Sequence, residues 1–169
     1  KPELIGPDEK LEIWIETDPT ARTLPISDNG IGMSREEVIA NIGTIAKSGT
    51  RELLQTLRER KSSETLTTLI GQFGVGFYSA FMAVDLVTLV TRRAGEEKAT
   101  KWESTGDGTF SIAEASRFTR GTSIVMHLKK FEDDDDVEDF TDKFVIERIV
   151  KRYSDFVAYP IHFKDKEGK

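Results

Sequence analysis

Three glycine-punctuated segments constrain the fold of this chain more than any other feature of its sequence. They are residues 28–33 (DNGIGM), 43–50 (GTIAKSGT) and 71–77 (GQFGVGF), and each adjoins an apolar strand or helix pattern. Glycine permits positive φ and lets a ligand approach the backbone closely. Three such loops in one domain predict a phosphate-bearing ligand that is held mainly by main-chain groups. The P-loop string GxxxxGK followed by Ser or Thr does not occur in the sequence.

Size and composition favour one globular domain. A chain of 169 residues is long enough to bury a sizeable core, with roughly 70% of the unfolded surface removed on folding. The net charge of -6 disfavours wholesale binding to nucleic acid or to an acidic membrane. The sequence has no cysteine, which excludes a disulfide scaffold, a thiolate zinc site and a cysteine nucleophile. The apolar runs are far short of a membrane span. Because the chain has no cysteine and no signal-peptide pattern at its start, we expect a reducing, cytoplasm-like compartment.

Hydrophobic periodicity predicts a hairpin followed by a capped helix. Residues 11–17 alternate as a half-buried strand, 18–20 have turn chemistry, and 23–27 form the returning strand. Ser34 and Glu37 stand in the positions of a capping box. The helix that they open has its apolar stripe at Val38, Ile39 and Ile42.

The rest of the chain predicts three more helices and a run of strands. Residues 51–60 have helical spacing at Leu53, Leu54 and Leu57. A helix should follow the third glycine segment and carry Tyr78, Phe81, Met82 and Val84. From residue 85 the period changes to two, which predicts strands at 86–91, 99–104, 109–112 and 122–128 in an antiparallel meander. A helix at about 141–154, with Phe144, Ile146, Ile149 and Val150 apolar, precedes a short strand at 160–163. The pattern is that of an α+β, two-layer sandwich: a mostly antiparallel sheet with helices on one face.

Asp28 is the leading candidate for ligand binding. It follows an apolar strand and precedes Gly30 and Gly32, which leave space beside it. A carboxylate there can accept a hydrogen bond from a ligand amine such as adenine N6. The same residues also fit a plain tight turn, and local sequence leaves both interpretations open.

The other candidates each have an ordinary explanation beside the functional one. Gly74 and Gly76 lead into a helix and could form an anion-binding nest, but no Rossmann unit surrounds them. Lys47 could pair with phosphate or simply be solvated. Asn41 could offer an amide to a sugar or phosphate, or serve as a helix cap. Thr122 could bond a base or a water molecule, although a threonine in a strand needs no functional reason.

Taken in order, these strings resemble the N-terminal nucleotide-binding domain of the heat-shock protein 90 family. The resemblance rests on DxGxGM at 28–33, the loop 43–50, GQFGVGF at 71–77, RGT at 120–122 and the closing YSDFVAYPI at 153–161. It covers essentially the whole chain. The residues 128–130 (LKK) followed by acids lean toward the bacterial or organellar members.

The resemblance implies a Bergerat-type ATP site. Asp28 would bind the adenine amine directly and through water, and Thr122 would join that water network. Gly32 and Met33 would line the adenine pocket, and Asn41 and Lys47 would approach the ribose and phosphates. Residues 47–71 would form a lid over ATP. The main chain that would wrap the phosphates belongs to Gly74, Val75, Gly76 and Phe77.

One departure from the family pattern concerns catalysis. In the family, a helix upstream of the first strand carries the general-base glutamate and an asparagine that holds magnesium, and no such string occurs here. We therefore expect residues 1–169 to be a single nucleotide-binding domain truncated at its N-terminus. In this chain we expect no catalytic residue and no metal ligand, with Mg²⁺ bound only by the parent protein.

The expected function is that of the ATP-binding module of an ATP-dependent chaperone. The parent would hydrolyse ATP to ADP and phosphate, respond to stress, bind unfolded client proteins and form a homodimer, in the cytoplasm or an organellar matrix. No nucleic acid or membrane partner is expected. Two alternatives stay open: a fragment that binds nucleotide or inhibitor without hydrolysis, and another Bergerat-fold ATPase or kinase domain. The lid entry at 46–50 (AKSGT) argues against a histidine kinase.

Overall fold

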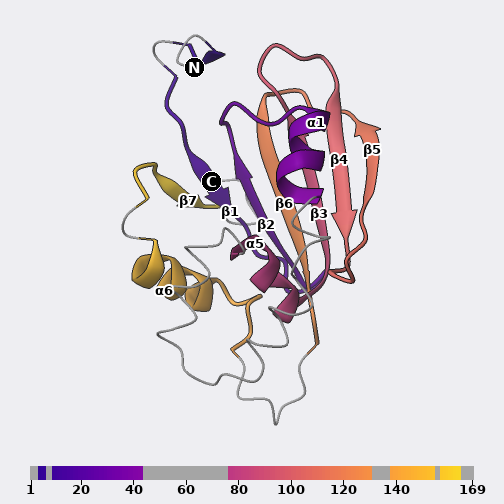
Figure 1. Cartoon of the computed structure of the whole chain (residues 1–169). Coiled ribbons are helices and arrows are strands. Elements are labelled where there is room, and N and C mark those ends of the chain that lie inside the picture. Colours follow the sequence, from indigo (N-terminus) through magenta and orange to yellow (C-terminus); the bar gives the residue numbers. More distant parts are fainter. Residues whose placement is uncertain (1–3, 7–8, 44–75, 131–137, 155–156, 165–169) are drawn as a thin grey trace.

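The computed structural model describes residues 4–6, 9–43, 76–130, 138–154 and 157–164. These residues build a seven-stranded sheet with helices packed against it (Figure 1). The lid segment with the predicted helix at 51–60, Lys47, Gly74 and Val75 all lie outside the described residues. The strands are β1 (Ile13–Ile15), β2 (Thr23–Asp28), β3 (Val84–Arg92), β4 (Ala99–Ser104), β5 (Ser111–Ala115), β6 (Gly121–Leu128) and β7 (Ile161–Phe163). The helices are α1 (Arg35–Val38), α5 (Gly76–Ser79) and α6 (Lys143–Tyr153).

The strand order is β5-β4-β3-β6-β2-β1-β7, and all neighbours are antiparallel except β1 and β7. The predicted α+β class is confirmed. The predicted meander is correct for β3, β4 and β5 but wrong for β6, which pairs with the opposite edge of β3. In this order β5 and β6 lie three strand spacings apart, a distance of about 14 Å. The six residue steps that connect them, from Ala115 to Gly121, can span up to roughly 20 Å. The loop is therefore long enough to place β6 in the centre of the sheet.

The capping box is formed as predicted. The Ser34 hydroxyl accepts the Glu37 N–H at 3.2 Å, and the Glu37 carboxylate accepts the Ser34 N–H at 2.9 Å. The α-helix then continues as a π-helical turn, Ile39–Gly43. Val38 is buried, but Ile39 is 41% exposed. The wider π turn changes the angle between successive side chains around the helix axis. The predicted apolar stripe is therefore wrong at Ile39, which points toward solvent.

The helix after Gly76 is shorter than predicted. It passes into a 3-10 turn, Ala80–Met82, and ends there. Phe81 is buried as expected, whereas Met82 is 47% exposed and Val84 already belongs to β3. The β-branched Val84 starts the period-two pattern of the strand, and this pattern prevails over the helical one.

Helix α6 begins after Asp142, whose carboxylate accepts the Phe144 N–H at 2.8 Å. Ile146 is buried in the same core cluster as Val38 and Phe81. Phe144, predicted to be part of the apolar stripe, is instead 78% exposed. Positions i and i+2 of a helix do not share a face, so Phe144 and Ile146 cannot both point into the core.

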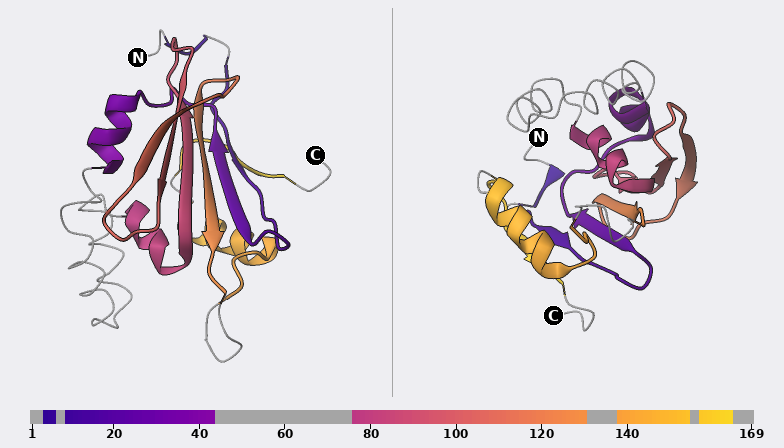
Figure 2. Two further views of the ribbon diagram at one scale, coloured as in Figure 1. Left: turned by 90° about the vertical axis from the view of Figure 1, so that its right-hand side faces the viewer. Right: turned by 90° about the horizontal axis from the view of Figure 1, so that it is seen from below.

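The core lies between the helices and one face of the sheet, and the left view of Figure 2 shows α1 and α5 on one side of the strands. Trp102 of β4 is fully buried at its centre. Its ring meets Phe77 edge to face at 5.8 Å and stacks on Phe110 at 6.2 Å. Among the described residues, no helix has the length and apolarity needed to cross a membrane.

Candidate nucleotide-binding site

The Asp28 carboxylate is held at the end of β2 by two main-chain donors. Its Oδ1 accepts the Gly30 N–H at 2.8 Å and the Thr122 N–H at 3.2 Å. Both bonds use the same oxygen. Oδ2 therefore has no hydrogen-bond partner within the described part of the chain, although the residue is half-buried. The carboxylate is fixed in orientation and presents one acceptor.

Asp28 begins a polar row that crosses adjacent strands on the helix-facing side of the sheet. Residue 28 lies one position beyond the Ser27–Ser123 pair, opposite Thr122 of β6. Thr122 in turn pairs with Thr91 of β3. Thr122 is 9% exposed and Thr91 is fully buried, and their hydroxyl oxygens lie 3.0 Å apart. A buried polar row of this kind is tolerated only when its groups are hydrogen-bonded.

The loop after β2 is fastened to the same row. The Met33 N–H donates to the Thr91 hydroxyl at 2.9 Å. Met33 itself packs against the core cluster. The row therefore brings together a carboxylate, two hydroxyl groups and an apolar side chain, the kinds of group that can hold a polar aromatic ring.

Two glycines make this arrangement sterically feasible. Gly32 has φ of 64°, and a Cβ there would lie 2.0 Å from the Arg92 carbonyl oxygen. Gly121 has φ of 108°, and a Cβ there would lie 2.2 Å from the Asp28 carbonyl oxygen. Both positions need the left-handed region and a close backbone approach, and glycine alone supplies both.

A guanidinium group supports Asp28 from the loop before β6. Arg117 donates from Nη2 to the Asp28 carbonyl oxygen at 3.0 Å and from Nη1 to the Ser123 hydroxyl. Burial lowers the pKa of Arg117, and the negative charge of Asp28 opposes that shift. The arginine stays cationic, so a charged donor holds both the Asp28 main chain and the Ser123 side chain.

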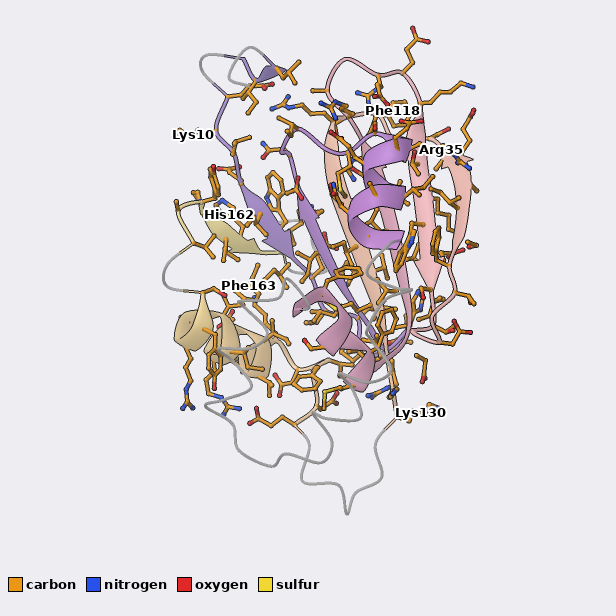
Figure 3. All side chains as sticks on the ribbon, in the orientation of Figure 1. Lys10, Arg35, Phe118, Lys130, His162 and Phe163 are labelled. Carbon is orange, nitrogen blue, oxygen red and sulfur yellow. The ribbon has the colours of Figure 1, made fainter. Side chains whose placement is uncertain are left out.

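The segment before β1 is tethered to the same end of the sheet. The Asn29 side chain accepts the Glu12 N–H and donates to the Lys10 carbonyl oxygen, both at 2.8 Å. Arg120 forms an ion pair with Glu9. Figure 3 labels Lys10 and Phe118 at this end of the molecule, with Lys130 at the opposite end. Residues adjoining Asp28 and Thr122 thus hold the upstream segment.

The residues expected to approach the phosphates lie on helical elements, away from the strand that carries Asp28. Asn41 is exposed on the π-helical turn, and the turn ends at Gly43, which lies against Phe110. Gly76 begins α5, and the Phe77 ring packs on Trp102. Both elements therefore reach the same Trp102–Phe110 pair. The Phe77 ring packs against the core cluster, and its main chain lies in the first turn of α5.

Sequence reasoning missed Thr91 and Arg117. Thr91 follows Val87 and Leu89 on the inward face of β3. The period-two alternation places it inward, so a polar residue at that position could have been noticed from the sequence. Arg117 gives no such signal, because a cation in a polar loop is normally solvated. Its contact with Asp28 spans 89 residues of sequence.

No cluster of metal-ligating side chains is found among the described residues. Within the described ranges, no three His, Cys, Asp or Glu side chains gather in a way that could hold a metal ion. The described part of the chain therefore does not offer a self-contained magnesium site.

A mostly antiparallel sheet with helices on one face, and an oriented carboxylate at the end of a central strand, is the architecture of a class of nucleotide-binding ATPase domains. Residues 8–119 match the family model described as histidine kinase-, DNA gyrase B-, and HSP90-like ATPase. The chain belongs to this ATPase family.

Relatives narrow the comparison to chaperones. The chain is 58% identical over 151 residues to the chaperone protein HtpG of Salinispora tropica. The matched region covers 89% of this chain and 24% of that protein. It is 54% identical over 157 residues to HtpG of Mycobacterium avium, covering 91% and 24%. The chain thus spans about a quarter of the length of these relatives. The matches confirm the resemblance to the heat-shock protein 90 family.

Proposed function

We propose that this chain is the ATP-binding module of an ATP-dependent chaperone and that residues 1–169 form a single nucleotide-binding domain. One observation carries the proposal: both main-chain donors bond Asp28 Oδ1, which leaves Oδ2 as an oriented acceptor beside a buried polar row. Family membership and the HtpG relatives support it. They also favour the chaperone over a kinase of the same family.

Adenine recognition would use the row as it stands. Asp28 Oδ2 accepts a hydrogen bond from the exocyclic N6 amine, and Thr122 bonds the neighbouring ring nitrogen directly or through water. Gly32 and Met33 line the ring. The charge-assisted bond to Asp28 contributes roughly 1.5–3 kcal/mol, and it selects a donor over an acceptor at that position of the purine.

Phosphate binding would fall to the main chain. Asn41 approaches the ribose and phosphates from the π-helical turn, and Lys47 does so from the lid. The main-chain N–H groups of Gly74, Val75, Gly76 and Phe77 wrap the phosphates. Successive amides in such a loop bind an anion without a dedicated charge.

The parent protein would hydrolyse ATP to ADP and phosphate, with clients and a homodimer partner bound elsewhere in its chain. We place it in the cytoplasm as a stress-response chaperone. The general base and the magnesium ligand would come from residues outside those described, so no step of the hydrolysis is assigned to this chain.

Calorimetric titration with ADP, with and without magnesium, tests the proposal when it is paired with phosphate release from ATP. We expect ADP to bind and phosphate release to stay at background. Binding with turnover would show that the chain carries its own catalytic group. A chain that binds no adenine nucleotide would refute the proposed site.

A further inference from the structure

Thr91 of β3 belongs to the buried polar row, and its hydroxyl joins the two halves of the site. The side chain is fully buried. Three contacts surround Oγ1: the Met33 N–H at 2.9 Å, Thr122 Oγ1 at 3.0 Å and the Gly121 carbonyl oxygen at 3.2 Å. We propose that Thr91 is a positioning residue of the purine site, which fixes the Met33 main chain and sets the direction of the Thr122 hydroxyl proton.

The hydroxyl of Thr91 has one proton to donate and two lone pairs. One lone pair accepts the Met33 N–H. The proton then goes either to Thr122 Oγ1 or to the Gly121 carbonyl oxygen. Thr91 thus connects the loop that lines the site to the strand that faces the purine.

These two proton positions have opposite consequences for Thr122. If Thr91 donates to Thr122, the Thr122 proton is free to be donated to a ligand. If Thr91 donates to Gly121, Thr122 donates back to Thr91 and offers only lone pairs. An adenine ring presents an acceptor at N1, so it selects the first arrangement. Thr91 therefore supplies the part of adenine selectivity that Asp28 does not.

This inference rests on the proposed function. A Thr91 variant tests the positioning role by itself, because the wild-type chain shows whether ADP binds at all. Thr91→Val keeps the shape of the side chain and removes the hydroxyl. The Met33 N–H loses its acceptor, and Thr122 loses its partner. We expect ADP to bind about tenfold more weakly, the loss that corresponds to about 1.4 kcal/mol.

The discriminating measurement is the ratio of ADP to inosine diphosphate affinity, determined by calorimetry well below the melting temperature. Inosine diphosphate carries N1–H and a 6-oxo group in place of the adenine pattern. If Thr91 directs the Thr122 proton, the preference for ADP falls in Thr91→Val and recovers in Thr91→Ser. A purely structural role would weaken both nucleotides alike.

Thr100→Val is the matched control. Thr100 lies directly across from Thr91 on β4 and is 7% exposed, and we expect it to keep both the affinity and the ratio. If Thr91→Val does not fold, Thr91→Cys carries the same test, because a thiol is a weak donor and acceptor of similar shape.

The outcomes distinguish the two claims. A wild-type chain that binds ADP, with a Thr91→Val variant of equal affinity and equal ratio, overturns the positioning role alone. Weakening that leaves the ratio unchanged overturns it as well. A wild-type chain that binds no ADP overturns the proposed function and this inference together.

Discussion

Replacing Asp28 by asparagine is the most direct perturbation of the site. Two main-chain N–H groups orient the carboxylate through Oδ1, at 2.8 Å and 3.2 Å. An asparagine keeps those two bonds if its own Oδ1 occupies the same place. Its NH₂ group then takes the position of Oδ2. The one acceptor offered to the ligand becomes a donor, while the surrounding loop stays as it was.

The size of the effect follows from this exchange. The lost charge-assisted hydrogen bond is worth roughly 1.5–3 kcal/mol, which corresponds to about 10- to 150-fold in affinity. The NH₂ group also faces the N6 amine, donor against donor, so this range is a lower bound. Because the bonds to Gly30 and Thr122 persist, the far-ultraviolet circular dichroism spectrum should change little.

Calorimetric titration of ADP into the wild-type and Asp28→Asn chains measures the loss. Asp107→Asn is the matched control, since the Asp107 carboxylate accepts the Thr109 N–H at 2.8 Å and its hydroxyl at 2.7 Å in the turn between β4 and β5. The control should bind ADP as the wild type does. An Asp28→Asn chain with unchanged affinity and spectrum would remove this carboxylate from the site.

Three further predictions concern stability. Gly121→Ala forces a side chain into φ of 108° and against the Asp28 carbonyl oxygen, so urea unfolding should show a loss of at least about 1–3 kcal/mol; a neutral result would mean that the backbone relaxes there. Ser34→Ala removes one half of the capping box, and the same measurement should show a loss of about 0.5–2 kcal/mol. The pKa of Asp139 lies below its usual 3.8 because the N–H and hydroxyl of Thr141 bond the carboxylate. The unfolded chain therefore binds more protons as the pH falls below 3.8, so the free energy of unfolding declines there, and Asp139→Asn should flatten that decline.

The sequence predicted those features that are determined by residues close together in the chain. The capping box at Ser34 depends on residues three apart, and the boundaries of β4 follow from a turn on each side. Asp28 was found because its carboxylate, the strand before it and the glycines after it are contiguous.

The features that the sequence did not reveal depend on distant pairing. The central place of β6 is decided by which edge of β3 it joins, and the turn chemistry before it fits either edge. Thr91 and Met33 are separated by 58 residues, so nothing local to either residue signals their bond. The exposure of Phe144 depends on the rotation of α6 against the core, which only the packed structure fixes.

The polar row explains why one oxygen can determine ligand choice. A buried hydroxyl or amide without a partner costs about 1–3 kcal/mol, and the groups of this row avoid that cost by bonding one another: Gly30 and Thr122 to Asp28 Oδ1, and Met33 and Thr122 to Thr91. The groups of this row are thus ordered by one another, so we expect them to reorganise little on binding. What the row leaves unsatisfied within the described residues is Asp28 Oδ2. A ligand gains most by bringing a donor to that atom, so we expect a 6-aminopurine to bind more tightly than a 6-oxopurine.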